Sequence, residues 1–364
     1  MDIVNDFVHL AKFALTGKHE DLVLLLRRSL PAISRQRPDL APEVTKLLAQ
    51  AGSNPGRAKS AVPDPVPVDI DSRLELVRRE EFPTINIEPT WDEKVRDSLE
   101  QVILERSQED RLQAAGVVPT RSLLFVGPPG VGKSLAARHV AERLQRPLMT
   151  LDLAAVMSSF LGRTGNNIRA VLDFARRTPS VLLLDEFDAI AKRRDDSAEV
   201  GELKRLVTVL LQAIDDWPYH SLLIAATNHP DLLDPAVWRR FDKVINFPLP
   251  SIENIKKALV VALSNQDQVI PDSLLQILSV LLIGKSFADL SKLILGARRE
   301  SVIKNVPLSS VLDELMRLSL REQNHANRIN FAVSLAQNGF SQREASEITG
   351  VSRDTIRNHI KLVK

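Results

Sequence analysis

The chain has 364 residues, of which 44% are hydrophobic and 26% charged, and this composition is that of a soluble globular protein with two or three domains. Its 48 basic and 46 acidic residues leave a formal net charge of +2. Because the total charge is nearly balanced, a surface that binds nucleic acid would have to be a local cluster of basic residues. Since the chain has no cysteine, disulfides, thiolate metal sites and a cysteine nucleophile are excluded.

The first fifty residues contain apolar positions at helical spacing, interrupted by Gly17 and Pro31. They predict a small N-terminal helical domain over residues 1–50. The opening stretch MDIVNDFVHLAKF has acidic residues where a signal peptide needs basic ones, and no apolar run reaches the length of a membrane span. We therefore expect a cytoplasmic protein without a membrane partner.

A linker separates this domain from the rest of the chain. Residues 51–68 read AGSNPGRAKSAVPDPVPV, and such a stretch cannot bury enough apolar surface to form a core. We assign residues 51–84 to the linker and lead-in, and residues 85–250 to a large α/β domain. Early in that domain, an apolar stripe at helical spacing indicates core packing and consists of Trp91, Val95, Leu99, Val102 and Ile103.

The stretch LLFVGPPGVGKS, residues 123–134, predicts a strand followed by a phosphate-binding loop. Its four apolar residues are typical of a strand buried on both faces of a parallel sheet. Glycines then allow backbone N–H groups to turn toward phosphate oxygens, and the helical pattern that follows adds the positive end of a helix dipole. The residues predicted to bind a nucleotide are Gly127, Pro128, Pro129, Gly130, Val131, Gly132, Lys133, Ser134 and Leu135.

Side chains suited to phosphate and metal chemistry occur in this loop and at the end of a second buried strand. Lys133 would reach the terminal phosphates, and Ser134 would place its hydroxyl on Mg²⁺, which needs only one or two protein oxygens. Two adjacent carboxylates, Asp185 and Glu186, end the apolar run VLLL. Such a pair is costly unless it faces a cation and water, so we assign Asp185 to Mg²⁺ and Glu186 to deprotonation of the attacking water.

Polar residues also follow the next strands of the chain. The buried strand SLLIAATN ends in Asn228, which would hydrogen-bond the attacking water or the terminal phosphate. Arg239 and Arg240 precede another short strand, and phosphoryl transfer commonly uses an arginine supplied by a neighbouring molecule. These segments predict an α/β fold, a parallel sheet flanked by helices, with a nucleotide and Mg²⁺ as its ligands.

Together, GPPGVGKS, LLLDEFDAI, ATN and LDPAVWRRFD resemble the motifs of an AAA ATPase, within the larger AAA+ group of P-loop NTPases. The resemblance covers residues 85–300 and includes GKSFADLSKLILGARRES, similar to a helix of the family's helical lid, which we place at residues 251–325. It implies ATP hydrolysis by a homo-oligomer, usually a hexameric ring. ATP would bind between the α/β part of one subunit and the edge of the next that carries Arg239 and Arg240.

The family uses two loops to contact its substrate, and this chain resembles it in both. Phe160, Leu161 and Gly162 stand where the family carries a pore-loop aromatic, an apolar residue and a glycine. Such an aromatic grips a polypeptide threaded through the ring; an ordinary core position for Phe160 is the alternative. The charged segment KRRDDSAEVGE, residues 192–202, corresponds to the second pore loop, and its mixed charge fits a solvated linker equally well.

The chain departs from the family pattern at two places. The segment LLQAIDDWPYHS replaces the common L-D-G form, to which intersubunit signalling is usually attributed. Phe287 and Ala288 lie near the place where some AAA+ branches carry an arginine, so we assign no second sensor arginine.

The last segment, residues 326–364, resembles a helix-turn-helix unit. Its pattern predicts three helices, with a turn at Gly350 and a recognition helix capped by Ser352. This segment holds six basic and three acidic residues, and the outward face of its last helix suits contacts to phosphates and base edges. The residues of that face are Arg353, Arg357, Asn358 and Lys361.

These observations support three hypotheses about function. The first is an ATP-driven ring that remodels or threads a protein substrate, for a separate effector such as a protease. The second is a DNA-binding ATPase or regulator that uses residues 326–364. The third is an ATP-gated assembly scaffold that seldom hydrolyses ATP, although Glu186 argues against it. The chain contains neither an HExxH pattern nor a serine elbow, so we expect no protease activity of its own.

Overall fold

The structure, a computed structural model, describes residues 66–68, 75–85, 87–153, 164–189, 200–263, 270–322 and 324–363. The predicted N-terminal domain lies outside these ranges. So do Phe160, Leu161 and Gly162, and most of the charged segment 192–202. No helix in the described part of the chain combines the length and the hydropathy needed to cross a bilayer.

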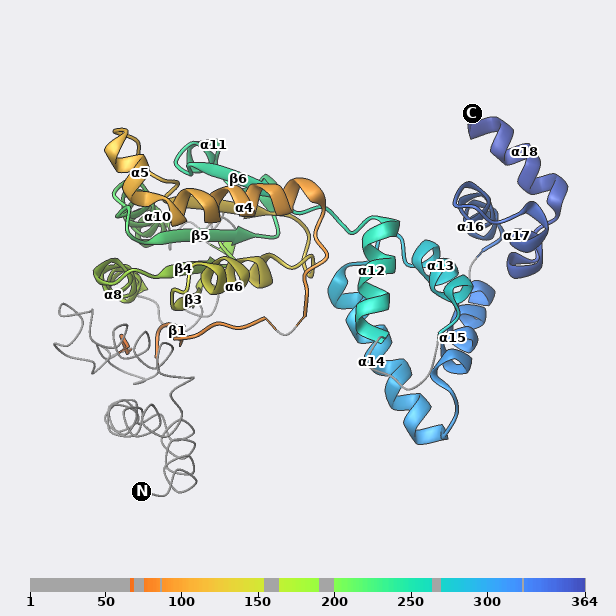
Figure 1. The fold of residues 1–364 in the computed structure, drawn as a ribbon. Helices are drawn as coiled ribbons and strands as arrows, with labels where there is room; N and C mark the ends of the chain where they lie inside the picture. Colours follow the sequence, from red (N-terminus) through yellow and green to blue (C-terminus); the bar gives the residue numbers. More distant parts are fainter. Residues whose placement is uncertain are drawn as a thin grey trace, which may run out of the picture. The chain divides into compact units, whose positions relative to one another are not determined.

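A six-stranded sheet forms the centre of the α/β part (Figure 1). In spatial order its strands are β1 (Arg78–Glu80), β3 (Leu148–Asp152), β4 (Val181–Asp185), β5 (Leu222–Thr227), β2 (Ser122–Val126) and β6 (Lys243–Asn246). All neighbours pair in parallel except β1, which pairs antiparallel with β3. The central strands are apolar runs with nearly every residue buried, as a parallel sheet between helices requires. The predicted parallel sheet is therefore confirmed.

Helices cover both faces of this sheet, because successive residues of a strand point to opposite sides. The helices of this part are α4 (Glu93–Ser107), α5 (Glu109–Ala114), α6 (Lys133–Arg143), α8 (Thr164–Arg177), α10 (Val200–Asp215) and α11 (Pro235–Trp238). In β2, Leu123 and Phe125 belong to the apolar cluster that contains α4 and α6. Leu124 and Val126 belong to the cluster that contains α8 and α10. The apolar stripe of α4 is core packing, as predicted, with Trp91 partly buried against it.

The buried side chain of Arg106 joins α4 to the beginnings of two strands. It donates hydrogen bonds to the backbone oxygens of Thr120 at 2.7 Å, Tyr219 at 2.6 Å and Ser221 at 2.8 Å. Burial lowers the pKa of Arg106 to about 10, and Glu109 opposes that shift, so the guanidinium stays charged at neutral pH. Arg106 thus supplies donors to carbonyl groups that lie beneath the surface.

The remaining described residues form helices that share one apolar core. These helices are α12 (Ile252–Leu263), α13 (Asp272–Leu281), α14 (Phe287–Lys304), α15 (Leu308–Glu322), α16 (His325–Gln337), α17 (Gln342–Thr349) and α18 (Arg353–Val363). Leu278 and Leu312 of the predicted lid belong to the same cluster as Leu335 and Ile356 near the C-terminus. The C-terminal segment is helical, as predicted, and packs with the lid.

Local capping signals account for the ends of the last helices. Ser341 and Glu344 form a capping box at the start of α17, and Gly350 ends that helix in the left-handed conformation. Ser352 Oγ accepts a hydrogen bond from the backbone N–H of Thr355 at 3.2 Å, so Ser352 caps α18. The turn therefore lies where the sequence pattern predicts it.

The glycine loop after β2 lies directly against the first turn of α14. The backbone N–H of Ala288 donates a hydrogen bond to the carbonyl oxygen of Gly130 at 3.1 Å. A Cβ atom at Gly130 would lie 2.6 Å from Ser286 Oγ and 2.7 Å from the Cβ of Ala288. Gly130 also has φ of 77°, a conformation that residues with side chains rarely adopt. The loop and the lid can therefore touch in this way only if residue 130 is glycine.

We predict that Gly130→Ala lowers the free energy of unfolding by about 2–4 kcal/mol, because the new methyl group combines an unfavourable φ with overpacking against the lid. Urea denaturation measures this change. Gly116→Ala is the matched control, since Gly116 has φ of +73° with nothing within 4 Å of its Cβ position. Gly116→Ala should lower the free energy of unfolding by only about 1–2 kcal/mol. Equal losses for the two variants would contradict the loop–lid contact.

Candidate active site

The side chain of Lys133 lies where the ends of β2 and β5 meet. Its Nζ donates hydrogen bonds to the carbonyl oxygens of Gly127 at 2.6 Å and Pro128 at 2.9 Å, and to Oδ1 of Asn228 at 2.7 Å. Burial lowers the pKa of Lys133 to about 8, and nearby carboxylates, Asp185 first among them, oppose the shift. The structure thus joins two residues that the sequence placed in separate motifs.

The loop also carries unused backbone donors. Helix α6 begins at Lys133, and the first N–H groups of a helix have no acceptor within it. Across the described ranges, the backbone N–H groups of residues 130–134 donate a hydrogen bond to no protein group. Free N–H groups at the start of an 11-residue helix suit phosphate oxygens, so the loop fits the predicted nucleotide.

Ser134 and Asp185 lie together, as the predicted magnesium site requires. Ser134 Oγ donates a hydrogen bond to Asp185 Oδ2 at 3.0 Å, which links the start of α6 to the end of β4. Among the described residues there is no group of three or more His, Asp or Glu that would hold a metal. Mg²⁺ does not need one, because it keeps several waters and binds through one or two protein oxygens. The hydroxyl and the carboxylate therefore fit this ion.

Glu186 has an unusual backbone conformation. Its φ is 51°, in the left-handed region, which is uncommon for a residue with a side chain. Its backbone N–H donates a hydrogen bond to Asp185 Oδ1 at 2.9 Å, and its side chain is exposed. Glu186 is therefore open to water beside the proposed metal ligand, and strained residues of this kind cluster at active sites.

The two arginines after α11 differ in their surroundings. Arg240 forms an ion pair with Asp215 at the end of α10, whereas Arg239 is exposed. Within the described part of this chain, neither arginine has a hydrogen bond or an ion pair with residues 127–135. The prediction that they act on the nucleotide of a neighbouring subunit stays a prediction.

The basic residues predicted for α18 lie on its surface. Arg353, Arg357, Asn358 and Lys361 are all exposed. Arg357 is also paired with Asp354 within the helix, at 3.1 Å. The structure brings them to one helix but places none of them at the glycine loop.

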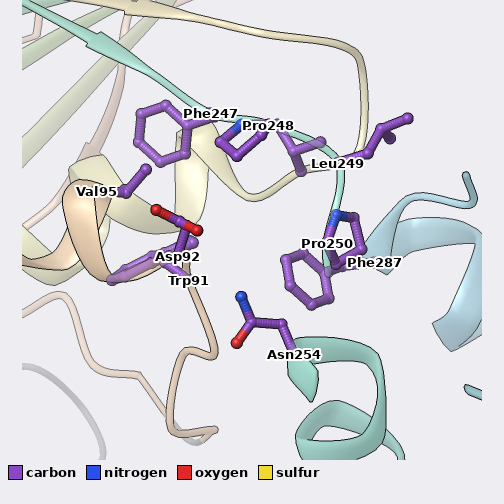
Figure 2. Close-up of a pocket in the computed structure, with 10 residues that line it drawn as sticks. Trp91, Asp92, Val95, Phe247, Pro248, Leu249, Pro250, Asn254 and Phe287 are labelled. Carbon is purple, nitrogen blue, oxygen red and sulfur yellow. The ribbon is translucent and has the colours of Figure 1, made fainter. Parts of the chain in front are cut away.

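A small pocket lies beside the glycine loop (Figure 2). Figure 2 shows Asn254 of α12 pointing between the indole of Trp91 and the ring of Phe287. Val131 of the loop also lines the pocket, and a Cβ atom at Gly132 would lie 2.9 Å from Trp91 Nε1. The lining of the pocket combines the aromatic rings of Trp91, Phe247 and Phe287 with the Asn254 amide and the Asp92 carboxylate.

Sequence patterns did not identify this pocket. The lining comes from five separate parts of the chain, which contribute Trp91 before α4, Val131 of the loop, Phe247 after β6, Asn254 of α12 and Phe287 of α14. The only available signal was Trp91, whose apolar spacing fits the core equally well. Its position against Gly132 appears only after the chain has folded.

We predict that nucleotide affinity falls as the pH rises above about 8, because only the ammonium form of Lys133 pairs with phosphate oxygens. Burial lowers the pKa of the ligand-free lysine, so each further pH unit should weaken binding by about tenfold until the bound form also titrates. Titration of a fluorescent ADP analogue from about pH 7 to about pH 10 measures this. Lys133→Ala should bind weakly and without this pH dependence. A constant affinity for the unchanged chain would contradict the role of Lys133.

The comparisons with known proteins agree with this geometry. Residues 123–249 match the family described as ATPase family associated with various cellular activities (AAA). An uncharacterized AAA family ATPase of Sinorhizobium fredii, y4kL, is 39% identical over 203 residues, which are 56% of this chain and 61% of that protein. The proteasome-activating nucleotidase of Methanopyrus kandleri is 33% identical over 226 residues, which are 59% of this chain and 52% of the length of that protein.

A eukaryotic relative and a solved structure extend the similarity. The 26S proteasome regulatory subunit 6A of Schizosaccharomyces pombe is 32% identical over 199 residues, which are 52% of this chain and 45% of the length of that protein. The chain thus spans between 45% and 61% of these three curated relatives. The crystal structure of the FIGL-1 AAA domain aligns with a TM-score of 0.54 and 25% identity, covering 63% of this chain and 76% of that one. Residues 123–249 therefore match the AAA ATPase domain model, and the α/β part resembles a solved AAA domain with a P-loop NTPase sheet.

Proposed function

We propose that the chain is a ring ATPase that uses ATP hydrolysis to remodel or thread a protein substrate. The observation that carries the ATPase half of this proposal is the convergence of four residues from three separate segments. Lys133 Nζ lies 2.7 Å from Asn228 Oδ1, and Ser134 Oγ lies 3.0 Å from Asp185 Oδ2. An ammonium, an amide, a hydroxyl and a carboxylate at one edge of the sheet are the groups that phosphoryl transfer needs.

Each group has one task in this proposal. The N–H groups of residues 130–134 and the ammonium of Lys133 hold the β- and γ-phosphates, while Ser134 and Asp185 hold Mg²⁺. Bound Mg²⁺ neutralises charge on the phosphate oxygens. Glu186 accepts a proton from the water whose oxygen bonds to the γ-phosphorus as the bond to the β–γ bridging oxygen breaks. Asn228 orients that water, and the products are ADP and phosphate.

The pocket beside the loop is our candidate for the base of the nucleotide. Trp91 and Phe287 offer aromatic surfaces against which a purine can stack, and the Asn254 amide offers one donor and one acceptor. Val131 connects this pocket to the phosphate loop. A ligand with its phosphates at Lys133 would therefore have its base within reach of all three side chains.

Sequence features and relatives support a ring that acts on protein. Two of the relatives are named a proteasome-activating nucleotidase and a proteasome regulatory subunit. By similarity to them, we assign copies of this chain and a protein substrate or effector as partners. Arg239, exposed on this chain, and Arg240 would act on the nucleotide of the next subunit. Phe160, Leu161 and Gly162 would contact the polypeptide.

We predict that an unfolded polypeptide raises the ATPase rate of the purified chain and that Phe160→Ala abolishes this stimulation, because the aromatic ring that grips the polypeptide is lost. Phosphate release with and without the polypeptide measures the effect. Phe160→Tyr is the matched control, since it keeps an aromatic ring and should retain stimulation. Glu186→Gln should bind ATP and stall, and it serves as the blank.

Three results would overturn parts of this proposal. Full stimulation of Phe160→Ala would exclude a gripping role for Phe160. Hydrolysis at the unchanged rate in Glu186→Gln would refute the general base. An unchanged chain that binds ATP but does not hydrolyse it would favour the assembly scaffold instead.

A second candidate function is DNA binding through the last three helices. The observation in its favour is the exposure of Arg353, Arg357 and Asn358 on α18, a helix whose Ile356 is fully buried in the core. Such an arrangement suits a helix that enters a groove. The pairing of Arg357 with Asp354 reduces the positive charge of this face.

We predict for this candidate that Arg353→Ala combined with Arg357→Ala weakens duplex binding and lowers the salt slope of the affinity by about 2, because two phosphate contacts are lost. Fluorescence anisotropy at several salt concentrations measures both quantities. Arg317→Ala combined with Arg321→Ala is the control, since it removes the same charge from α15. Identical behaviour of the two double variants would reject DNA binding by α18.

A further inference from the structure

Asp188 is a buried carboxylate to which neither the sequence nor the proposed function gives a role. It is 3% exposed and lies on the turn after β4, three positions beyond Asp185. Its Oδ1 accepts a hydrogen bond from Thr227 Oγ1 at 3.2 Å and another from the backbone N–H of Asn228 at 3.2 Å. A carboxylate that leaves water needs such donors, so both of them contribute to holding it there.

The turn that carries Asp188 is joined to β5 by its backbone as well. The N–H of Phe187 donates a hydrogen bond to the carbonyl oxygen of Ala226 at 2.9 Å. The N–H of Ala189 donates to the carbonyl oxygen of Glu186 at 2.8 Å and closes the turn. The Asp188 carboxylate is therefore held in place against the last residue of β5 and the residue that follows it.

Asn228 connects this carboxylate to the phosphate loop. Its backbone N–H is held by Asp188, while its side-chain Oδ1 accepts the hydrogen bond from Lys133 Nζ at 2.7 Å. Asn228 thus contacts Asp188 through its backbone and Lys133 through its side chain. The hydrogen bond to Asp188 fixes the position of Asn228 after β5, and the hydrogen bond from Lys133 depends on that position.

We propose that Asp188 is a positioning residue for ATP hydrolysis: it fixes the backbone of Asn228 at the end of β5, and so holds the Asn228 amide against Lys133 and beside the γ-phosphate. This inference rests on the proposed ATPase function. In this proposal Asp188 contacts neither the nucleotide nor the attacking water, and it acts through Asn228.

The test is a double-mutant cycle on the assembled full-length chain, with ATP turnover as the readout. Asp188→Ala should lower kcat by about 10- to 100-fold, with a smaller change in KM, because misplaced catalytic groups affect the chemical step more than binding. Asn228→Ala should lower kcat by a similar factor. The double variant should be no slower than the slower single variant, since both changes remove the same interaction.

Two further variants separate positioning from a structural role. Asp188→Asn keeps an acceptor oxygen for both donors and should recover most of the lost kcat. Thr227→Val removes the hydrogen bond from Thr227 to Asp188 but leaves the one from the backbone of Asn228. It should therefore lower the melting temperature while leaving kcat nearly unchanged. If Asp188→Ala does not fold, the cycle uses Asp188→Asn, whose smaller loss of kcat should likewise disappear in the Asn228→Ala background.

The outcomes are distinguishable. An unchanged chain without ATPase activity would overturn the proposed function and this inference with it. An active chain in which Asp188 and Asn228 substitutions multiply their losses of kcat would overturn this inference alone. So would full kcat in both Asp188 variants. Loss of kcat in Asp188→Ala that is not repeated in the Asn228→Ala background would establish the positioning role.

Discussion

The rest of the site depends on the hydrogen bonds that the ammonium group of Lys133 donates. Its hydrogen bonds to Gly127, Pro128 and Asn228 join the start of α6 to the ends of β2 and β5. A buried ammonium without an anionic partner is costly, and burial accordingly lowers its pKa to about 8. Phosphate oxygens would supply the opposite charge.

This convergence is possible because β4, β5 and β2 are parallel neighbours, so that their carboxyl ends lie at one edge of the sheet. Each strand is apolar until its end, where the first polar group or glycine appears. Asp185, Asn228 and Gly127 are therefore placed by the same rule. The turn after β4 adds Asp188, which ties the first two of these strand ends to each other.

The glycine loop is bounded by the lid as well as by the sheet. Gly130 accepts a hydrogen bond from Ala288, and the neighbouring Phe287 lines the pocket beside the loop. The helix that begins with these residues, α14, belongs to the core that also contains α16, α17 and α18. A ligand that reshapes the loop therefore acts on the first turn of a helix whose packing continues to the C-terminal helices.

The sequence by itself determined the parallel sheet, the phosphate loop and the strand-end residues Asp185 and Asn228, because those signals are local. An apolar run of strand length followed by glycine, acid or amide needs no knowledge of distant residues. The contact between Lys133 and Asn228 joins residues 95 positions apart, and the pocket that Trp91, Asn254 and Phe287 help to line joins five segments. Asp188 appeared in the sequence only as one more acid after a strand. Tertiary structure alone decided these contacts, because they exist only once the crossovers have set β5 between β4 and β2.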